Sequence, residues 1–302
     1  MLDIVIQARK ADIGGLEVGR VLPFRDRRMV GPFIFLDHGG PVTMAPGIPR
    51  TKDVLPHPHI GLSTVSYLLH GEWMHRDSTG VEQPIRPGEV NWMTAGRGVT
   101  HSERFEGAFQ RSGGLLELLQ AWVALPESSE ETEPTFDHFG HAALPVFEEP
   151  GFWGRLIVGS AYGAKSPAPV HSPQFYLHVE LQAGAATGLP PGYPERAAYV
   201  VKGAIEVDGH AYRPGQMLVF AAGAAPTIKA LEPSTVMLLG GEPVGPRHIW
   251  WNFVSSSKAR IEQAKADWKA GRIAMPYHDG EEFVPLPEPR VQAVPPAPEP
   301  LS

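Results

Sequence analysis

The chain has 302 residues, a formal net charge of −7 and no cysteine. The lack of cysteine excludes disulfides, thiolate metal ligands and a cysteine nucleophile. An acidic balance without a run of Lys or Arg argues against direct nucleic-acid binding, and no apolar stretch approaches the ~18 residues of a membrane span. The start, MLDIVIQARKADIGG, lacks the pattern of a signal peptide, so we expect a cytoplasmic protein with no membrane partner.

The 33 glycines and 32 prolines are spread between short alternating segments rather than gathered in one linker. This punctuation indicates an all-β sandwich or barrel, and a length of about 150 residues a domain suggests two domains. Residues 33–36 are expected to form a strand. The following Asp37-His38-Gly39-Gly40 is expected to be a turn, because paired glycines support tight backbone geometry.

Two pairs of metal-ligand residues come next, His57 with His59 and His101 with Glu103. Side chains two residues apart leave an extended strand on the same face. Two such strands facing each other would offer three imidazoles and one carboxylate to a single ion. That set suits iron, nickel, copper, manganese or zinc. The alternative is a group of core or surface histidines with a nearby ion pair.

The chain also contains an internal repeat, which predicts two similar β domains. The recurring segments are Tyr67–Gly71 with Tyr199–Gly203, Arg86-Pro87-Gly88 with Arg213-Pro214-Gly215, and Ala95-Gly96 with Ala222-Gly223. The acidic segment 127–133, which we expect to be solvated, lies near the junction. The predicted division is a metal-binding barrel over 1–130, a degenerate barrel over 134–246, and a helical extension with a Pro-rich tail over 247–302.

The repeat provides a control for the metal hypothesis. Counting the same offsets in the second copy, without gaps, replaces all four ligand candidates by residues that cannot bind a metal through their side chains: Leu189, Pro191, Ile228 and Ala230. Because the second copy keeps the turn residues and loses the whole ligand set, the four candidates are expected to act together in one barrel.

The C-terminal extension is predicted to contain one helix, with N-cap options at 255–257 and a stop at Gly271. Ile261, Ala264 and Trp268 fall on one face, which should pack against a barrel. Trp250 and Trp251 are expected to pack this extension rather than bind a ligand. The Pro-rich end from residue 285 is predicted to be extended or disordered.

The stretches HPHIGLSTVSYLLHGEWMHRDSTG (57–80) and RPGEVNWMTAGRGVTHSE (86–103) resemble the pirin family, a branch of the cupin superfamily. The resemblance implies two antiparallel cupin (jelly-roll) β-barrels in tandem, followed here by a short helix. It also implies one divalent metal in the first barrel, held by His57, His59, His101 and Glu103. Iron is the common metal of the family, and nickel, copper, manganese, cobalt and zinc are the alternatives.

Some members of this family oxidise the flavonol quercetin with O₂, so the resemblance implies a quercetinase-like dioxygenase with a small aromatic substrate. Glu103 would then also take the proton of the substrate hydroxyl. The pocket should be largely apolar, and Phe33, Phe35, Trp92 and Met93 are the candidate wall residues. The alternative is a redox-sensitive regulatory protein that binds a transcription factor or a metabolic enzyme.

Two further positions bear on the predicted site. His75 could orient a ligand or contact the substrate from behind the ligand set, or it could be structural and pair with Arg76 or Asp77. The general cupin pattern places a glutamate four residues after the second histidine, where this chain has Ser63. Because the ligand implied by the resemblance is the later Glu103, this departure leaves the predicted ligand set intact.

Overall fold

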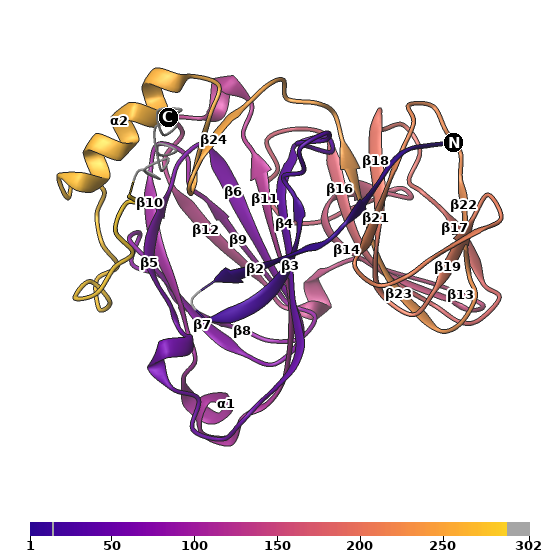
Figure 1. The fold of residues 1–302 in the computed structure, drawn as a ribbon, viewed down its shortest axis with the longest axis horizontal. Helices are drawn as coiled ribbons and strands as arrows, with labels where there is room; N and C mark the ends of the chain where they lie inside the picture. Colours follow the sequence, from indigo (N-terminus) through magenta and orange to yellow (C-terminus); the bar gives the residue numbers. More distant parts are fainter. Residues whose placement is uncertain (14, 289–302) are drawn as a thin grey trace, which may run out of the picture.

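The computed structural model describes residues 1–13 and 15–288 and consists of two β units with a C-terminal extension (Figure 1). The first unit is a sandwich of two antiparallel sheets. Its large sheet has the order β12 (Thr135–Phe139), β9 (Val90–Thr94), β6 (Leu62–His70), β11 (Gly114–Ala124), β4 (Phe33–Met44), β3 (Leu16–Leu22) and β2 (Arg9–Ile13). Its small sheet has the order β5 (Val54–His59), β10 (Val99–Arg104), β7 (Trp73–Asp77) and β8 (Glu82–Ile85).

The second unit repeats this plan. Its large sheet has the order β1 (Leu2–Gln7), β21 (Gln216–Phe220), β18 (Glu195–Lys202), β23 (Ser234–Gly241), β16 (Gln174–Leu181), β14 (Phe152–Ala161) and β13 (Val146–Glu149), with β15 (Ala164–Lys165) paired to β14. Its small sheet has the order β17 (Ala186–Gly188), β22 (Thr227–Ala230), β19 (Ile205–Val207) and β20 (His210–Tyr212).

The repeated turns have the same backbone contacts in both units. Gly88 donates its N–H to the carbonyl of Leu68, and Gly215 donates to Val200, each over 2.9 Å. Both glycines have a positive φ, 79° and 85°, which only glycine adopts without cost. The equivalent geometry explains why the Arg-Pro-Gly segment recurs in the sequence.

The large sheets pack face to face and bury a core shared by the two units. Phe33, Tyr67 and Trp92 from the first unit and Tyr176 and Tyr199 from the second all have at most 1 % of their surface exposed. Because the other faces line the interiors of the two sandwiches, the central strands are buried on both sides. Their sequences are accordingly near-continuous apolar runs.

Two strands pair across the predicted domain division. β1 lies at the start of the chain and pairs with β21 of the second unit, which carries the N-terminus over to that unit (Figure 1). β12 follows residue 134 and pairs with β9 of the first unit. The shared core explains both pairings, because β1 and β12 each form the edge of a large sheet that borders this core. The sheets therefore do not follow the predicted boundaries at 1–130 and 134–246 at these two strands.

The extension carries a hairpin of β24 (His248–Trp250) and β25 (Phe253–Ser255) and the helix α2 (Lys258–Lys269). Ser257 caps α2 by accepting a hydrogen bond from the N–H of Arg260, and Ile261, Ala264 and Trp268 are its buried residues, as predicted. They pack on Ile60 and Phe253. A second helix, α1 (Gly107–Ser112), was not predicted. None of the described helices is long and apolar enough to span a membrane.

The remaining elements are three short 3-10 helices, Arg50–Lys52, Glu127–Ser129 and His141–Ala143. The turn expected at residues 37–40 is wrong, because β4 continues through both glycines to Met44 and pairs there with β11. Of the Pro-rich tail, residues 289–302 lie outside the described residues, so its predicted disorder stays a prediction.

Candidate metal centre and cavity

β5 and β10 are neighbours and bring the two ligand pairs together. His101 lies opposite His57, and His59 lies opposite Val99. The register shifts between His101 and Glu103, so Glu103 faces Val54, whereas a regular register would place it opposite Leu55. β5 is an edge strand, which is where a sheet tolerates the prolines that flank His57.

The three histidines form a compact, buried cluster. His57, His59 and His101 can each offer a ring nitrogen, and these atoms all lie within 4.8 Å of one another. Their ring centroids are 4.4 to 5.0 Å apart. Burial lowers the pKa of His57 to about 4 and those of His59 and His101 well below the usual value. All three are therefore neutral near pH 7, the state in which imidazole binds a metal.

Backbone carbonyls fix the tautomers of two of these rings. His57 Nδ1 lies 2.9 Å from the carbonyl oxygen of Leu55, and His59 Nδ1 lies 3.1 Å from that of Asn252. Each Nδ1 must donate its proton to the carbonyl, so each Nε2 keeps a free lone pair. This is the arrangement by which outer groups orient metal-binding histidines.

Glu103 lies beside this cluster. Its Oε1 is 3.3 Å from His101 Nδ1. Its Oε2 and His101 Nε2 are buried and have no hydrogen-bond partner among the described residues. Buried polar atoms rarely lack a partner without a functional reason. Burial raises the pKa of Glu103 to about 8, and the charge of Arg104 opposes this shift only in part. The three neutral imidazoles fit a transition metal. Glu103 is not among the residues whose ligand atoms lie within 4.8 Å of one another, so its place in the ligand set stays a prediction.

His75 connects the cluster to a buried carboxylate. On β7 it lies directly opposite Glu103, and Asp77 lies opposite His101. His75 Nε2 is 2.9 Å from Asp77 Oδ2, and His75 Nδ1 is 3.4 Å from His101 Nδ1. The predicted pairing with Asp77 is therefore present, and the same ring also reaches a candidate ligand. A proton on His75 Nε2 leaves its Nδ1 free to accept from His101.

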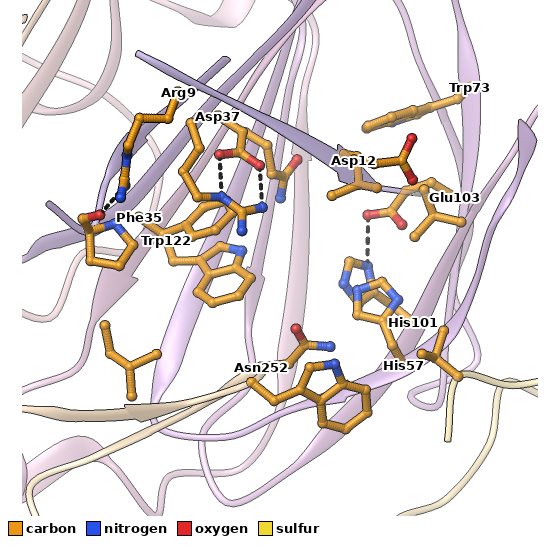
Figure 2. A pocket seen from close by; sticks show the side chains of 18 residues that line it. Arg9, Asp12, Phe35, Asp37, His57, Trp73, His101, Glu103, Trp122 and Asn252 are labelled. Atoms are coloured by element: carbon orange, nitrogen blue, oxygen red, sulfur yellow. Dashed lines mark hydrogen bonds and ion pairs between the residues drawn. The ribbon is translucent and has the colours of Figure 1, made fainter. Parts of the chain in front are cut away.

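A cavity of about 560 Å³ opens onto the cluster. Figure 2 shows His57, His101 and Glu103 at one end and Arg9, Phe35, Asp37 and Trp122 at the other. Its lining consists of Arg9, Asp12, Ile13, Arg20, Pro23, Phe35, Asp37, Val54, His57, Trp73, His101, Glu103, Gln120, Trp122, Ile249, Trp251, Asn252 and Val284. His59 does not line it but packs edge-on against the wall residue Trp122, with ring centroids 5.0 Å apart.

One of the four predicted wall residues lines this cavity. Phe35 does, and it stacks on Trp122 at 4.0 Å between centroids. Phe33 and Trp92 instead lie in the core between the units, and Met93 is buried within the first unit beside that wall. A β-bulge explains the error for Phe33. The register shifts between Trp122 and Val123 at this point of β4, which breaks the two-residue alternation that placed Phe33 and Phe35 on one face.

The far end of the cavity carries an ion pair that the sequence did not reveal. Arg20 donates from Nε and Nη2 to the two carboxylate oxygens of Asp37, over 2.9 and 2.7 Å. Its guanidinium also lies 4.6 Å from the centroid of Phe35. Burial raises the pKa of Asp37, and Arg20 opposes that shift. Asp37 was missed because it was assigned to a turn.

The C-terminal extension closes another side of the cavity with Ile249, Trp251, Asn252 and Val284. The Val284 N–H donates to the carbonyl of Pro56, which covers the open edge of β5. The expectation that Trp251 serves packing alone is therefore incomplete. No local pattern could have found Asn252, since its carbonyl acts on a histidine 193 residues away.

The acidic segment 127–133 is not wholly solvated as expected. Glu130 is only 5 % exposed. It pairs with Arg247 at 2.9 Å and accepts hydrogen bonds from the Ser255 hydroxyl and the Ser256 N–H, each over 2.8 Å. A buried carboxylate is retained where cations and donors compensate it, and here it anchors both ends of the extension's hairpin.

Comparisons with known proteins agree with this architecture. Residues 15–123 match the family model "Pirin", and residues 176–274 match "Pirin C-terminal cupin domain". The chain belongs to the pirin family. It is 61 % identical to a pirin-like protein of Caulobacter vibrioides, over 95 % of this chain and all of that protein.

Two further pirin relatives carry quercetinase names. A Pseudomonas aeruginosa protein named "Putative quercetin 2,3-dioxygenase" is 38 % identical, over 88 % of this chain and 83 % of that protein. A crystal structure of quercetin 2,3-dioxygenase from Acinetobacter baumannii superposes with a TM-score of 0.86 at 33 % identity, covering 96 % of each chain. The predicted fold of two tandem cupin domains is confirmed for this pirin.

Proposed function

We propose that this pirin is a metal-dependent oxidoreductase that acts, like a quercetin 2,3-dioxygenase, with O₂ on a flavonol or a similar enolic aromatic compound. The observation that supports it most is the cavity that opens onto the histidine cluster. Its volume of about 560 Å³ lies within the range of small-molecule sites. A regulator that signals through its surface has no need of such a cavity. We further propose iron as the resident metal and the cytoplasm as its location.

The proposed ligands are His57, His59, His101 and Glu103. The first two present Nε2, because carbonyls hold their Nδ1 protons. A divalent metal bound there would stabilise an oxyanion of the substrate as a Lewis acid. Asp77 and His75 would hold the ring of His101 in place through their hydrogen bonds.

Glu103 is the proposed proton acceptor. In the metal-free protein burial raises its pKa to about 8, so its carboxyl would have to give up its own proton when a metal binds before it can act as a base. Its Oε2 has no partner among the described residues, so this atom can take up and hold the proton of a substrate hydroxyl. The stacked rings of Phe35 and Trp122 offer an apolar surface that keeps water away from a flat substrate.

The test is to reconstitute purified protein separately with iron, nickel, copper, manganese, cobalt and zinc, and to follow O₂ uptake together with loss of flavonol absorbance. We expect turnover with at least one metal. No turnover with any of them would refute the dioxygenase and would favour the regulatory alternative. His59→Ala should lose most bound metal by elemental analysis, whereas the exposed His70 gives a matched control, since His70→Ala should keep it.

A further inference from the structure

The C-terminal hairpin places a tryptophan where the backbone favours glycine. Trp250 pairs with Phe253, so β24 and β25 are joined by a two-residue loop, Trp251 and Asn252. Trp251 has a φ of 54°. Two-residue hairpin loops carry glycine, asparagine or aspartate at such positions. A bulky residue there costs free energy and persists only where the surroundings or the function require it.

The rest of the hairpin holds this loop in place. Phe253 is fully buried and forms a parallel bridge with Ile60, the residue after His59. Arg247 and Ser255 both bind the buried Glu130. The loop therefore has a fixed position over the end of β5, and the conformation of Trp251 is imposed rather than chosen by the residue itself.

The two loop residues both line the cavity. The carbonyl of Asn252 accepts a hydrogen bond from His59 Nδ1. Because this carbonyl belongs to the backbone, the hydrogen bond does not require a particular side chain at position 251. Trp251 lines the cavity and is half-buried. It also packs on the apolar cluster of the extension, edge-on to Phe253 at 5.5 Å and to Trp250 at 6.2 Å between centroids.

We infer that Trp251 is a ligand-binding residue of the cavity. Its indole supplies, from the C-terminal extension, an aromatic wall for a flat aromatic ligand, in addition to Phe35 and Trp122 from the first cupin domain. The inference rests on the proposed function for the class of ligand, but it does not require turnover. A role in ligand binding explains why a tryptophan occupies this strained position, where a glycine would not be strained.

The experiment measures binding of quercetin without O₂, by equilibrium dialysis against metal-loaded and metal-free protein. Trp251→Gly should fold and keep its metal, because glycine accepts a positive φ and the Asn252 carbonyl remains. We expect quercetin to bind about tenfold more weakly, as for loss of an aromatic contact in a binding site. Trp251→Phe should recover most of the affinity, whereas Trp251→Leu should not.

Asp208 supplies the control for strain alone. It is an exposed non-glycine residue with a φ of 51° in the second domain, so Asp208→Gly should leave quercetin binding unchanged. Unchanged binding in Trp251→Gly, or no binding by the wild-type protein, would overturn the inference. If Trp251→Gly does not fold, equal affinities for the Phe and Leu variants overturn it. Binding without turnover would refute only the dioxygenase.

Discussion

The two small sheets of this protein have the same strand order and different interiors. β5-β10-β7-β8 and β17-β22-β19-β20 are equivalent. His101 faces His57 in the first sheet, and Ile228 faces Thr187 in the second. If Ile228 takes the place of His101, the pairing makes Thr187 and Leu189 equivalent to His57 and His59. The gapless count on the sequence had given Leu189 and Pro191, two residues further along the chain. The count was wrong in detail, but its conclusion holds.

The second sheet fills the same interior with hydrocarbon. Leu189, Ile205, Ile228 and Ala230 belong to one apolar core. By the same pairing, Ile205 faces Ala230 where His75 faces Glu103. The comparison teaches that the cupin scaffold does not need the ligand set. In the first domain that set leaves buried polar atoms without partners, which costs stability in the metal-free protein.

The largest expected effect comes from giving the first domain the interior of the second. The double variant His101→Ile with Glu103→Ala should bind no metal, measured by elemental analysis. Its midpoint of urea unfolding should stay close to that of the metal-free wild type. The gain of about 1–3 kcal/mol from removing unsatisfied polar groups is offset in part by loss of the hydrogen bond between His101 and His75. A variant that loses metal and also fails to fold would show that the polar set supports the scaffold.

The reverse exchange is the matched control. Ile228→His with Ala230→Glu introduces a polar pair where Thr187 and Leu189 offer no further imidazoles. We expect this variant to bind no metal and to lose about 2–5 kcal/mol of unfolding free energy, since an uncompensated charge enters an apolar core.

The same comparison shows which parts of the site a sequence can reveal. His57, His59 and His101 were found because a local rule, the alternation of side chains along a strand, places them on one face. Phe33 was misplaced because a bulge breaks that rule. Asp37 was missed because it was assigned to a turn. Trp251 and the Asn252 carbonyl were missed because they reach the cavity through tertiary packing, which no local pattern encodes. The recurrence of turns at fixed spacings predicted two similar β domains, whereas the cupin fold was implied by the family resemblance.

A second, smaller effect concerns pH. The pKa of Glu103 is raised to about 8 in the folded protein, so its carboxyl is protonated near pH 7 and must lose that proton to bind a metal. Below pH 8, metal affinity should therefore fall about tenfold per pH unit, and binding should release about one proton. Titration calorimetry in buffers of different ionisation enthalpy measures this release, which Glu103→Gln should abolish.

The metal-free protein should show the opposite trend. A raised pKa contributes stability below the unfolded value near 4.5, and this contribution is lost as pH rises through about 8. The lowered pKa values of the histidines change the stability only below about pH 6.5. Between pH 6.5 and 8 the wild type should therefore lose stability relative to Glu103→Gln. A constant difference in unfolding free energy across this window would contradict the assignment.

The smallest effect tests how the two domains are joined. Their interface contains two reciprocal hydrogen bonds: Tyr67 of the first domain meets His178 of the second at 2.9 Å, and Tyr199 of the second meets His38 of the first at 3.0 Å. Each histidine is backed by a glutamate, Glu180 and Glu117 respectively. Tyr67→Phe and Tyr199→Phe should each cost about 1 kcal/mol of unfolding free energy, measured by urea unfolding.

The duplication makes these two bonds comparable, but their surroundings differ. The Tyr67 hydroxyl also accepts a bond from Arg155 Nη1 over 3.3 Å, so Tyr67→Phe removes two hydrogen bonds and should cost more than Tyr199→Phe, although Arg155 Nη1 keeps its bond to the Gly88 carbonyl. Tyr162→Phe removes a hydroxyl that is bonded at the surface to the Gly188 carbonyl, and it should cost less than about 0.5 kcal/mol. Equal losses of unfolding free energy in all three variants would show that the two interface hydroxyls stabilise the domain interface no more than a surface hydrogen bond stabilises the protein.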